Sequence, residues 1–262
     1  MKIVVPVKQV PEVSEVRMNE ETGTLIRDGV PSILNPFDEL AVEAAIQLVE
    51  THGGEVTVIT MGPPQAKDAL LKALAMGADN AVHLTDIAFA GADTLATAFT
   101  LSEYIRKMEF DLVICGKQAI DGDTAQVGPE IAEFLSIPQI CYVRKIEVSE
   151  DGKHVTAHRE TDEGYEVVKA KLPALLTATK GLNEPRLPNI MGIMKAKKKP
   201  FEEVNAETLG ADTALLGLTG SPTQVRKVFP PEKKEGGIVI DGDDPADAVK
   251  QLVEFLTKKG AF

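Results

Sequence analysis

Short apolar and β-branched runs alternate with amphipathic helical patterns over residues 1–137, and no other feature constrains the fold as strongly. Strands are predicted at 3–7, 56–60, 80–84 and 111–115, and helices at 36–52, 66–76, 94–108 and from about 128 to 135. Strands that alternate with helices in this way pair in parallel, because each helix carries the chain back to the same end of the sheet. The sequence therefore predicts an α/β fold, a doubly wound parallel sheet with helices on both faces.

The connection at residues 116–128 is the strongest candidate for a binding site. It follows the predicted strand at 111–115 and precedes a predicted helix. Such a loop lies at the carboxyl edge of a parallel sheet, where ligands bind, and the loops at 7–10 and 61–63 should converge there too. Its glycines allow close backbone approach, its polar side chains offer donors and acceptors, and the free N–H groups of the next helix suit an anion. We expect this loop to bind a nucleotide.

The residues assemble no other site with comparable clarity. Asp121 and Asp123 could bind a metal or act as acid and base, but we expect them to shape the loop or to hydrogen-bond a ligand. Asp123 and Gln126 also have the spacing of a helix capping box. His154 and His158 share one face of a predicted strand, which is only a weak indication of a metal site. Since the sequence contains no glycine-rich dinucleotide turn, no P-loop and no recognisable nucleophile–base set, we predict neither a catalytic group nor a metal.

Charge and composition narrow the functional class. The net charge of −12 argues against nonspecific nucleic-acid binding, which depends on neutralising phosphates with Lys and Arg. No apolar run approaches the roughly 20 residues of a membrane span, and the first residues do not resemble a signal peptide. Cys115 and Cys141 do not make a disulfide framework, and Cys115 is expected to be a buried free thiol. These features predict a cytoplasmic protein.

After residue 138 the regular alternation of strands and helices stops. Strands are predicted at 142–148, 155–159, 165–169 and 174–178. The middle two alternate apolar and polar residues, as expected for antiparallel strands that are covered on one face only. This part of the chain should therefore add a half-exposed β-ribbon to the sheet.

The remainder of the chain indicates an interaction surface and an arm. Residues 180–199 are basic and contain prolines, and the lysine-rich run at 195–199 is either a solvated surface or a patch that steers an acidic partner. Residues 200–242 show little periodicity, and the chain ends in a predicted amphipathic helix. A segment of this kind does not build its own core. We therefore predict an α/β domain at 1–199 and an extended C-terminal arm at 200–262 that packs on another subunit.

Six segments occur together in the order and at the spacing found in one known family. They are 7–11 (VKQVP), 35–38 (NPFD), 75–79 (AMGAD), 116–129 (GKQAIDGDTAQVGP), 182–186 (LNEPR) and 194–199 (MKAKKK). Over nearly the whole chain they resemble the β subunit of the electron-transfer flavoproteins. The resemblance implies the adenine nucleotide α-hydrolase-like version of the doubly wound sheet. It also implies a heterodimer, in which the C-terminal arm of β embraces an α subunit.

The resemblance further implies an electron carrier that works between a flavin dehydrogenase, such as an acyl-CoA dehydrogenase, and an acceptor. In the housekeeping branch of the family the β site holds a structural AMP. In the electron-bifurcating branch it holds a second FAD, which is reduced by NADH. Residues 121–129 and 220–225 resemble the bifurcating members, and Gly122 leaves more room beside the phosphates than a side chain would. We therefore favour FAD over AMP, although 182–186 and the lysine run resemble both branches.

Matching positions supply two sets of site residues. The cofactor-binding set comprises Pro6, Lys8, Asn35, Asp38, Met61, Gly62, Cys115, Gly116, Lys117, Gln118, Asp121, Gly122, Asp123, Thr124, Ala125, Gln126, Val127 and Gly128. The second set belongs to a recognition loop at about 180–199 that docks the dehydrogenase, with Leu182 as its apolar anchor. It comprises Leu182, Asn183, Glu184, Pro185, Arg186, Lys195, Lys197 and Lys198.

Overall fold

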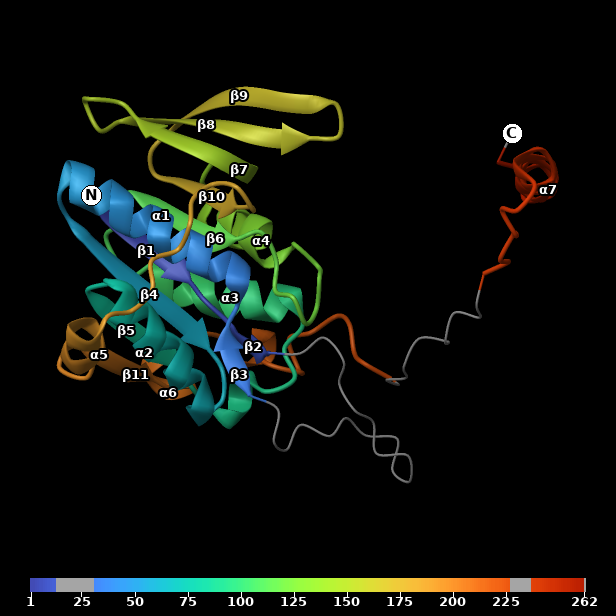
Figure 1. The fold of residues 1–262 in the computed structure, drawn as a ribbon. Helices are drawn as coiled ribbons and strands as arrows, with labels where there is room; N and C mark the ends of the chain where they lie inside the picture. Colours follow the sequence, from blue (N-terminus) through green and yellow to red (C-terminus); the bar gives the residue numbers. More distant parts are fainter. Residues whose placement is uncertain (13–30, 227–236, 262) are drawn as a thin grey trace.

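The computed structural model describes residues 1–12, 31–226 and 237–261. Within these residues, nine strands form one sheet in the spatial order β11-β5-β4-β1-β6-β10-β7-β8-β9 (Figure 1). Its central strands are parallel: β1 (Lys2–Pro6), β4 (Glu55–Met61), β5 (Asn80–Leu84), β6 (Leu112–Gly116) and β10 (Ala174–Ala178). The strands predicted from the sequence coincide with these five to within one residue at each end.

Helices cover both faces of the sheet (Figure 1). α1 (Pro36–His52) and α2 (Lys67–Met76) contribute to one buried apolar cluster, and α3 (Thr94–Ile105) and α4 (Val127–Leu135) contribute to another. Short 3₁₀ turns, η1 (Pro64–Ala66) and η2 (Ile87–Phe89), lie before α2 and α3. Val5 belongs to the first cluster and Val4 to the second, because successive side chains of a strand point to opposite faces. This two-sided burial confirms the predicted doubly wound α/β fold.

The order of the strands reverses between β1 and β6. β4 and β5 follow β1 in the sequence and lie on one side of it in the sheet, whereas the next strand, β6, lies on the other side of β1. β1 pairs with β4 as far as Pro6, but it pairs with β6 only through Ile3 and Val4. Pro6 has no N–H to donate, so the two strands part at their carboxyl ends. A crevice at such a reversal is where ligands bind to open α/β sheets.

Three antiparallel strands extend the sheet as the predicted ribbon. They are β7 (Gln139–Val148), β8 (His154–Thr161) and β9 (Gly164–Lys171). Val155 and Ala157 are buried, whereas His154 and His158 are half-exposed on the opposite face of β8. No group of three or more His, Cys, Asp or Glu side chains that could hold a metal was found in the described ranges.

The start of the predicted arm belongs to the domain. β11 (Phe201–Val204) pairs with β5 at the edge of the sheet, and α6 (Ala206–Leu209) and the turn η3 (Thr213–Leu215) follow it. Val204, Leu209 and Leu216 are buried in the cluster shared with α3. A four-residue edge strand with one buried side chain at its end has too few residues for its period to be recognised. The boundary predicted at 199/200 therefore does not mark where the chain leaves the domain.

Three further elements were not predicted, and one segment is only partly described. α5 (Ile190–Ala196) lies beside α2, where the sequence indicated a loop. β2 (Gln9–Pro11) and β3 (Ser32–Leu34) form a separate antiparallel pair between β1 and α1. Turn signals at 21–23 and 27–29 of the sequence suggest a small hairpin within residues 12–34, and it would fall largely on residues 13–30, outside the described residues.

The last helix, α7 (Pro245–Lys258), confirms the amphipathic prediction. Asp244 caps it by accepting the N–H groups of Ala246 and Asp247. None of its residues is buried, and its apolar side chains Val249, Leu252 and Val253 are exposed. Figure 1 shows α7 apart from the sheet. None of the described helices has the length and hydropathy needed to cross a membrane.

Candidate functional site: the loop between β6 and α4

Asn35 ties the loop between β6 and α4 to the start of α1. Its side-chain Nδ2 donates to the carbonyl of Gln118 at 2.8 Å, and its Oδ1 accepts the N–H of Ile120 at 3.2 Å. Asn35 is also the N-cap residue of α1, as Asn before Pro36 in the sequence indicates, but its side chain makes no cap bond to the helix. The amide is fully buried and is used to hold the loop instead.

Asp38 joins the tips of β1 and β6 in the same place. Its buried carboxylate accepts the N–H of Lys8, just after β1, at 2.7 Å, and it lies against Gly116 at the end of β6. A Cβ on residue 116 would lie 2.2 Å from Asp38 Oδ1 and 2.7 Å from the carbonyl carbon of Phe37, so only glycine fits. Burial raises the pKa of Asp38 to about 7, against the opposing effect of the donors around it.

The two aspartates of the loop are engaged within the chain. Both carboxylate oxygens of Asp121 lie within 2.8 Å of the ammonium of Lys8. Asp123 Oδ1 accepts a hydrogen bond of 2.6 Å from the side chain of Gln118. The predicted capping box of Asp123 with Gln126 does not form, because α4 begins at Val127 and Gln126 makes no side-chain cap bond. Both aspartates therefore shape the loop.

The backbone of the same loop offers a row of donors. Within the described part of the chain, the N–H groups of residues 124–128 have no hydrogen-bond acceptor. Asp123 and Ala125 are left-handed, with φ of 51° and 54°, and Gln126 is right-handed. Alternation of this kind turns successive N–H groups toward one side and forms a nest that binds anions. A left-handed conformation costs non-glycine residues roughly 1 kcal/mol or more, and such strain is concentrated at functional sites.

The four glycines of the predicted site differ in what they do. A Cβ on Gly122 would have no atom of the chain within 4 Å, so neither packing nor backbone conformation requires glycine there. A Cβ on Gly128 would lie 2.9 Å from Thr177 Cγ2, and one on Gly62 would lie 2.9 Å from Ala66 Cβ. Gly116, Gly62 and Gly128 therefore serve close packing, whereas the missing side chain of Gly122 leaves open space beside the loop.

Two residues that the sequence did not single out also shape this edge. His83 is buried, and its Nε2 lies 3.1 Å from the carbonyl oxygen of Gly62, which makes this nitrogen the protonated one. Since the N–H of Gly62 donates to Leu84, both backbone groups of Gly62 are already used. Tyr142 has φ of 61°, and the Lys117 ammonium lies 5.2 Å from the centre of its ring. Neither role could be read from a lone His or Tyr in a strand.

The remaining predicted cofactor residues lie at the ends of the central strands. Pro6 is the buried last residue of β1, and Met61 is the half-exposed last residue of β4. Cys115 is buried beneath Gly128, and burial raises the pKa of its thiol well above the usual range. The predicted set is thus brought to one edge of the sheet, although Cys115 contributes packing and no exposed group.

Comparison with known proteins identifies the family. The family described as "Electron transfer flavoprotein domain" matches residues 22–209, which include the loop, α1 and the ribbon. The chain belongs to the electron transfer flavoprotein family. It is 53% identical over 260 residues to an "Electron transfer flavoprotein subunit beta" of Thermoanaerobacterium thermosaccharolyticum, with 99% of each chain covered.

Two further relatives extend the family comparison. The chain is 55% identical over 259 residues to a protein of the same name from Clostridium acetobutylicum, with 99% of this chain and 97% of the relative covered. It is 48% identical over 261 residues to the "Caffeyl-CoA reductase-Etf complex subunit CarD" of Acetobacterium woodii, with 99% of each chain covered. The family membership therefore extends over the full chain.

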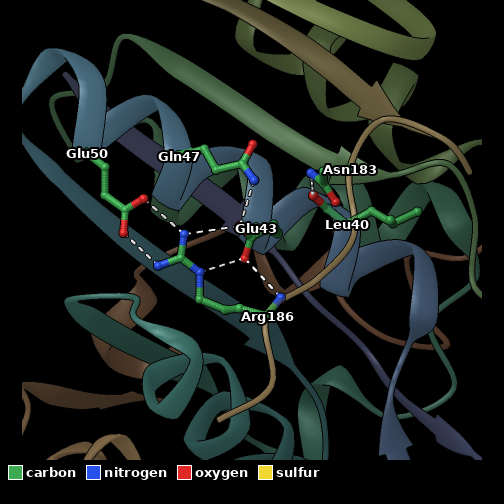
Figure 2. Close-up of polar contacts among 6 residues, drawn as sticks. All are labelled: Leu40, Glu43, Gln47, Glu50, Asn183 and Arg186. Carbon is green, nitrogen blue, oxygen red and sulfur yellow. Dashed lines mark hydrogen bonds and ion pairs between the residues drawn. The ribbon is translucent and has the colours of Figure 1, made fainter. Parts of the chain in front are cut away.

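The recognition loop expected from this family is held to the domain at its start. Leu182 is half-buried against the core, and the Asn183 side chain donates to the carbonyl of Leu40 at 2.9 Å. Arg186 binds Glu43 and Glu50 on α1 (Figure 2). Glu184 is exposed and Pro185 is half-buried.

The exposed part of the predicted recognition loop lies at residues 187–198. Lys195, Lys197 and Lys198 are exposed, but Lys199 donates to the carbonyls of Leu74 and Ala78 at the end of α2. The exposed apolar side chains are Leu187, Ile190, Met191, Ile193 and Met194. The apolar surface predicted at Leu182 is thus formed by α5 and the residues just before it.

Asp38→Asn is expected to change the pH dependence of stability. A carboxyl whose pKa is raised from 3.8 to about 7 keeps a proton in the folded chain that the unfolded chain has released. Its contribution to the free energy of unfolding therefore falls as pH rises from about 4 to about 7, by an amount on the order of a few kcal/mol. Asn keeps an acceptor oxygen but does not titrate. Urea unfolding across this pH range should show the difference, wild type minus variant, decreasing with pH; parallel curves would exclude this role for Asp38.

Gly116→Ala and Gly122→Ala form a matched pair of substitutions. At Gly116 the added methyl group meets backbone and a buried carboxylate, so we expect a loss of about 1–3 kcal/mol in the free energy of unfolding. At Gly122 the methyl group meets nothing, and stability should stay within about 0.5 kcal/mol of the wild type. Chemical denaturation of both variants is the measurement. Equal losses in the two would show that the loop is not packed as described.

Proposed function

We propose that this chain is the β subunit of a heterodimeric electron-transfer flavoprotein and that the loop between β6 and α4 holds the pyrophosphate of FAD. The chief support is the row of unpaired N–H groups at 124–128 beside the open space at Gly122. Five successive donors exceed what one phosphate oxygen accepts, which favours the longer anion of a dinucleotide. The alternative is AMP in the same place, with a structural role and no redox centre in this subunit.

The residues of this chain would bind and orient the nucleotide. The loop N–H groups would supply neutral donors to the phosphates, whereas the charge of Lys8 at the mouth of the loop is balanced by its ion pair with Asp121. Asn35 and Asp38 hold the loop against α1 and keep these donors in place. A bound FAD supplies the redox chemistry, accepting electrons from NADH or a flavin dehydrogenase and passing them on. We therefore assign no catalytic residue to this chain and propose that any NADH oxidation belongs to the heterodimer.

A partner subunit is proposed to cover the end of the chain. The exposed apolar side chains of α7 lie at helical spacing along a helix that buries none of its residues within the described chain. Ile238 and Val239, which precede it, are exposed as well. Apolar helix faces of this kind are buried in stable assemblies. The α subunit is the partner that the family provides.

The docking segment, residues 187–198, is proposed to bind the dehydrogenase. Its exposed leucine, isoleucines and methionines stand beside three exposed lysines, an apolar centre with a charged border. Methionine adapts to different surfaces, which suits a carrier with several partners. The relative named as part of a caffeyl-CoA reductase complex supports a dehydrogenase that acts on CoA esters. The three exposed lysines suit a docking site bordered by acidic residues.

Gly122→Asp and Gly122→Asn test the proposed nucleotide site. The two side chains have nearly the same size, and neither meets an atom of the chain at its Cβ. The acidic one adds a charge beside the pyrophosphate, so we expect the variant with Asp to retain less FAD, by about tenfold in affinity, and the variant with Asn to lose less. The measurement is the flavin content of the purified α–β heterodimer after dialysis. Wild-type flavin content in the Asp variant would contradict a pyrophosphate at this position.

Replacing Lys197 and Lys198 by Gln tests the charged border. Both ammonium groups are exposed, and charge steering is screened by salt. We expect electron transfer from an acyl-CoA dehydrogenase to slow several-fold at low ionic strength and the difference to vanish at high ionic strength. Lys199→Gln is the control, because Lys199 is bound to the end of α2 and its loss should lower stability without changing the salt dependence. An unchanged rate at low salt would show that these lysines do not steer the dehydrogenase and are only a solvated part of the surface.

A further inference from the structure

We infer that Arg186 and Glu43 form a clamp that positions the docking segment on α1, and that Glu43 acts without touching any partner. Glu50 completes the clamp at its exposed end. The inference rests on the proposed docking function of residues 187–198. It assigns a positioning role to the part of the recognition loop that the family resemblance treats as a docking surface.

The contacts of the clamp are numerous and directional (Figure 2). Arg186 Nε and Nη2 donate to the two carboxylate oxygens of Glu43 at 2.8 and 3.1 Å, and the backbone N–H of Arg186 donates to the same group at 3.2 Å. Nη1 and Nη2 donate to Glu50 at 2.6 and 3.0 Å. The planar guanidinium of Arg186 therefore donates to two carboxylates at once, one along each of two edges. Lysine cannot provide this geometry.

Of the two glutamates that bind Arg186, Glu43 fixes its position more strongly, because Glu43 is buried. Its side chain is 4% exposed, whereas Glu50 is 57% exposed. A buried carboxylate is costly unless it is paired and hydrogen-bonded, and besides Arg186 Glu43 has only one further side-chain donor among the described residues, Gln47 at 2.7 Å. The folded chain therefore holds Arg186 in one place. At the exposed end, Arg186 holds the pKa of Glu50 below its usual range.

The chain on both sides of Arg186, before α5 begins, has no regular structure that would hold it in place. Residues 183–189 belong to no helix or strand, and no backbone N–H among them donates to a backbone carbonyl of the described chain. Their path is set by side chains, Asn183 on the carbonyl of Leu40 and Arg186 on Glu43. Leu187, the most exposed apolar residue of the docking segment, directly follows the clamp.

The far end of the docking segment is held on α2. A Cβ on Gly192 would lie 2.4 Å from the carbonyl oxygen of Ala75, so glycine lets α5 approach the end of α2 closely. Lys199 donates to two carbonyls at the same helix end. Asn189 caps α5 by accepting the N–H of Gly192. The exposed apolar side chains thus lie between two fixed points, and the first of these is the clamp.

α1 links the clamp to the nucleotide loop. Its first turn contains Asp38, and Glu43 and Glu50 follow on the same helix. A docking surface attached to this helix keeps a fixed relation to the loop that Asn35 and Asp38 hold. Loss of the clamp should therefore weaken docking while leaving the nucleotide in place.

The test uses the purified α–β heterodimer as electron acceptor for an acyl-CoA dehydrogenase, with KM for the heterodimer and kcat measured separately. We expect Glu43→Gln and Arg186→Gln each to raise KM about tenfold with kcat and nucleotide content unchanged. Arg186→Lys should fall between these variants and the wild type. The double variant should resemble the single ones, because both remove the same clamp. Arg106→Gln, which removes an arginine bound to Glu103 and the carbonyl of Phe134, is the matched control and should behave as the wild type.

Glu43 separates positioning from direct contact. If Arg186→Gln raises KM and Glu43→Gln does not, Arg186 touches the dehydrogenase itself and the clamp is excluded. If neither changes KM, the segment keeps its place without the clamp, and the inference is overturned. If either single variant folds poorly, the double variant is measured instead, because it leaves no buried charge without a partner. A wild-type KM in the double variant would overturn the clamp.

Leu187→Ala distinguishes failure of the clamp from failure of the docking proposal. A raised KM in Leu187→Ala together with a wild-type KM in Glu43→Gln would contradict the clamp and leave the docking proposal standing. A wild-type KM in both Leu187→Ala and Met191→Ala would contradict the docking proposal on which the clamp rests.

Discussion

The buried carboxylate of Asp38 is the constraint on which the rest of the site depends. It accepts the N–H of Lys8 just after β1, it lies against Gly116 at the end of β6, and it belongs to the first turn of α1. The two strands diverge at this point, so without this carboxylate the N–H of Lys8 would lack an acceptor among the described residues. The close approach of Gly116 follows from it, since any side chain there would occupy the position of the carboxylate. The loop that begins at Gly116 therefore starts from a fixed position.

The proposed functions of the molecule are arranged around α1. Its first turn and Asn35 hold the loop that we propose binds the nucleotide, and its middle holds Arg186 before the docking segment. The loop stores strain in two left-handed residues and leaves its N–H groups free, which is an unfavourable arrangement for the chain alone. An anion would satisfy these donors. This is the physical reason for proposing a nucleotide at a loop that contains no catalytic side chain.

The sequence predicted the elements that have strong periodicity and missed those that depend on distant partners. The central strands and α1–α4 were recognisable because each buries a regular pattern of side chains. β11 and α5 were not, because four and seven residues carry too little pattern and both are stabilised by neighbours far along the chain. The position of the loop at the carboxyl edge of the sheet could be predicted as well, because the strand before it has a clear apolar pattern. The pairing of Arg186 with Glu43 joins residues 143 positions apart, and no local pattern indicates it.

The nucleotide released when the purified α–β heterodimer is denatured tests the central claim most directly. Separation of the released nucleotides by liquid chromatography gives the number of each per heterodimer. A pyrophosphate on the loop between β6 and α4 predicts FAD in this subunit, and hence two FAD for each heterodimer that has one in its α subunit. One FAD and one AMP would contradict FAD at this site and leave the loop with a structural nucleotide. Release of no second nucleotide would contradict the site itself.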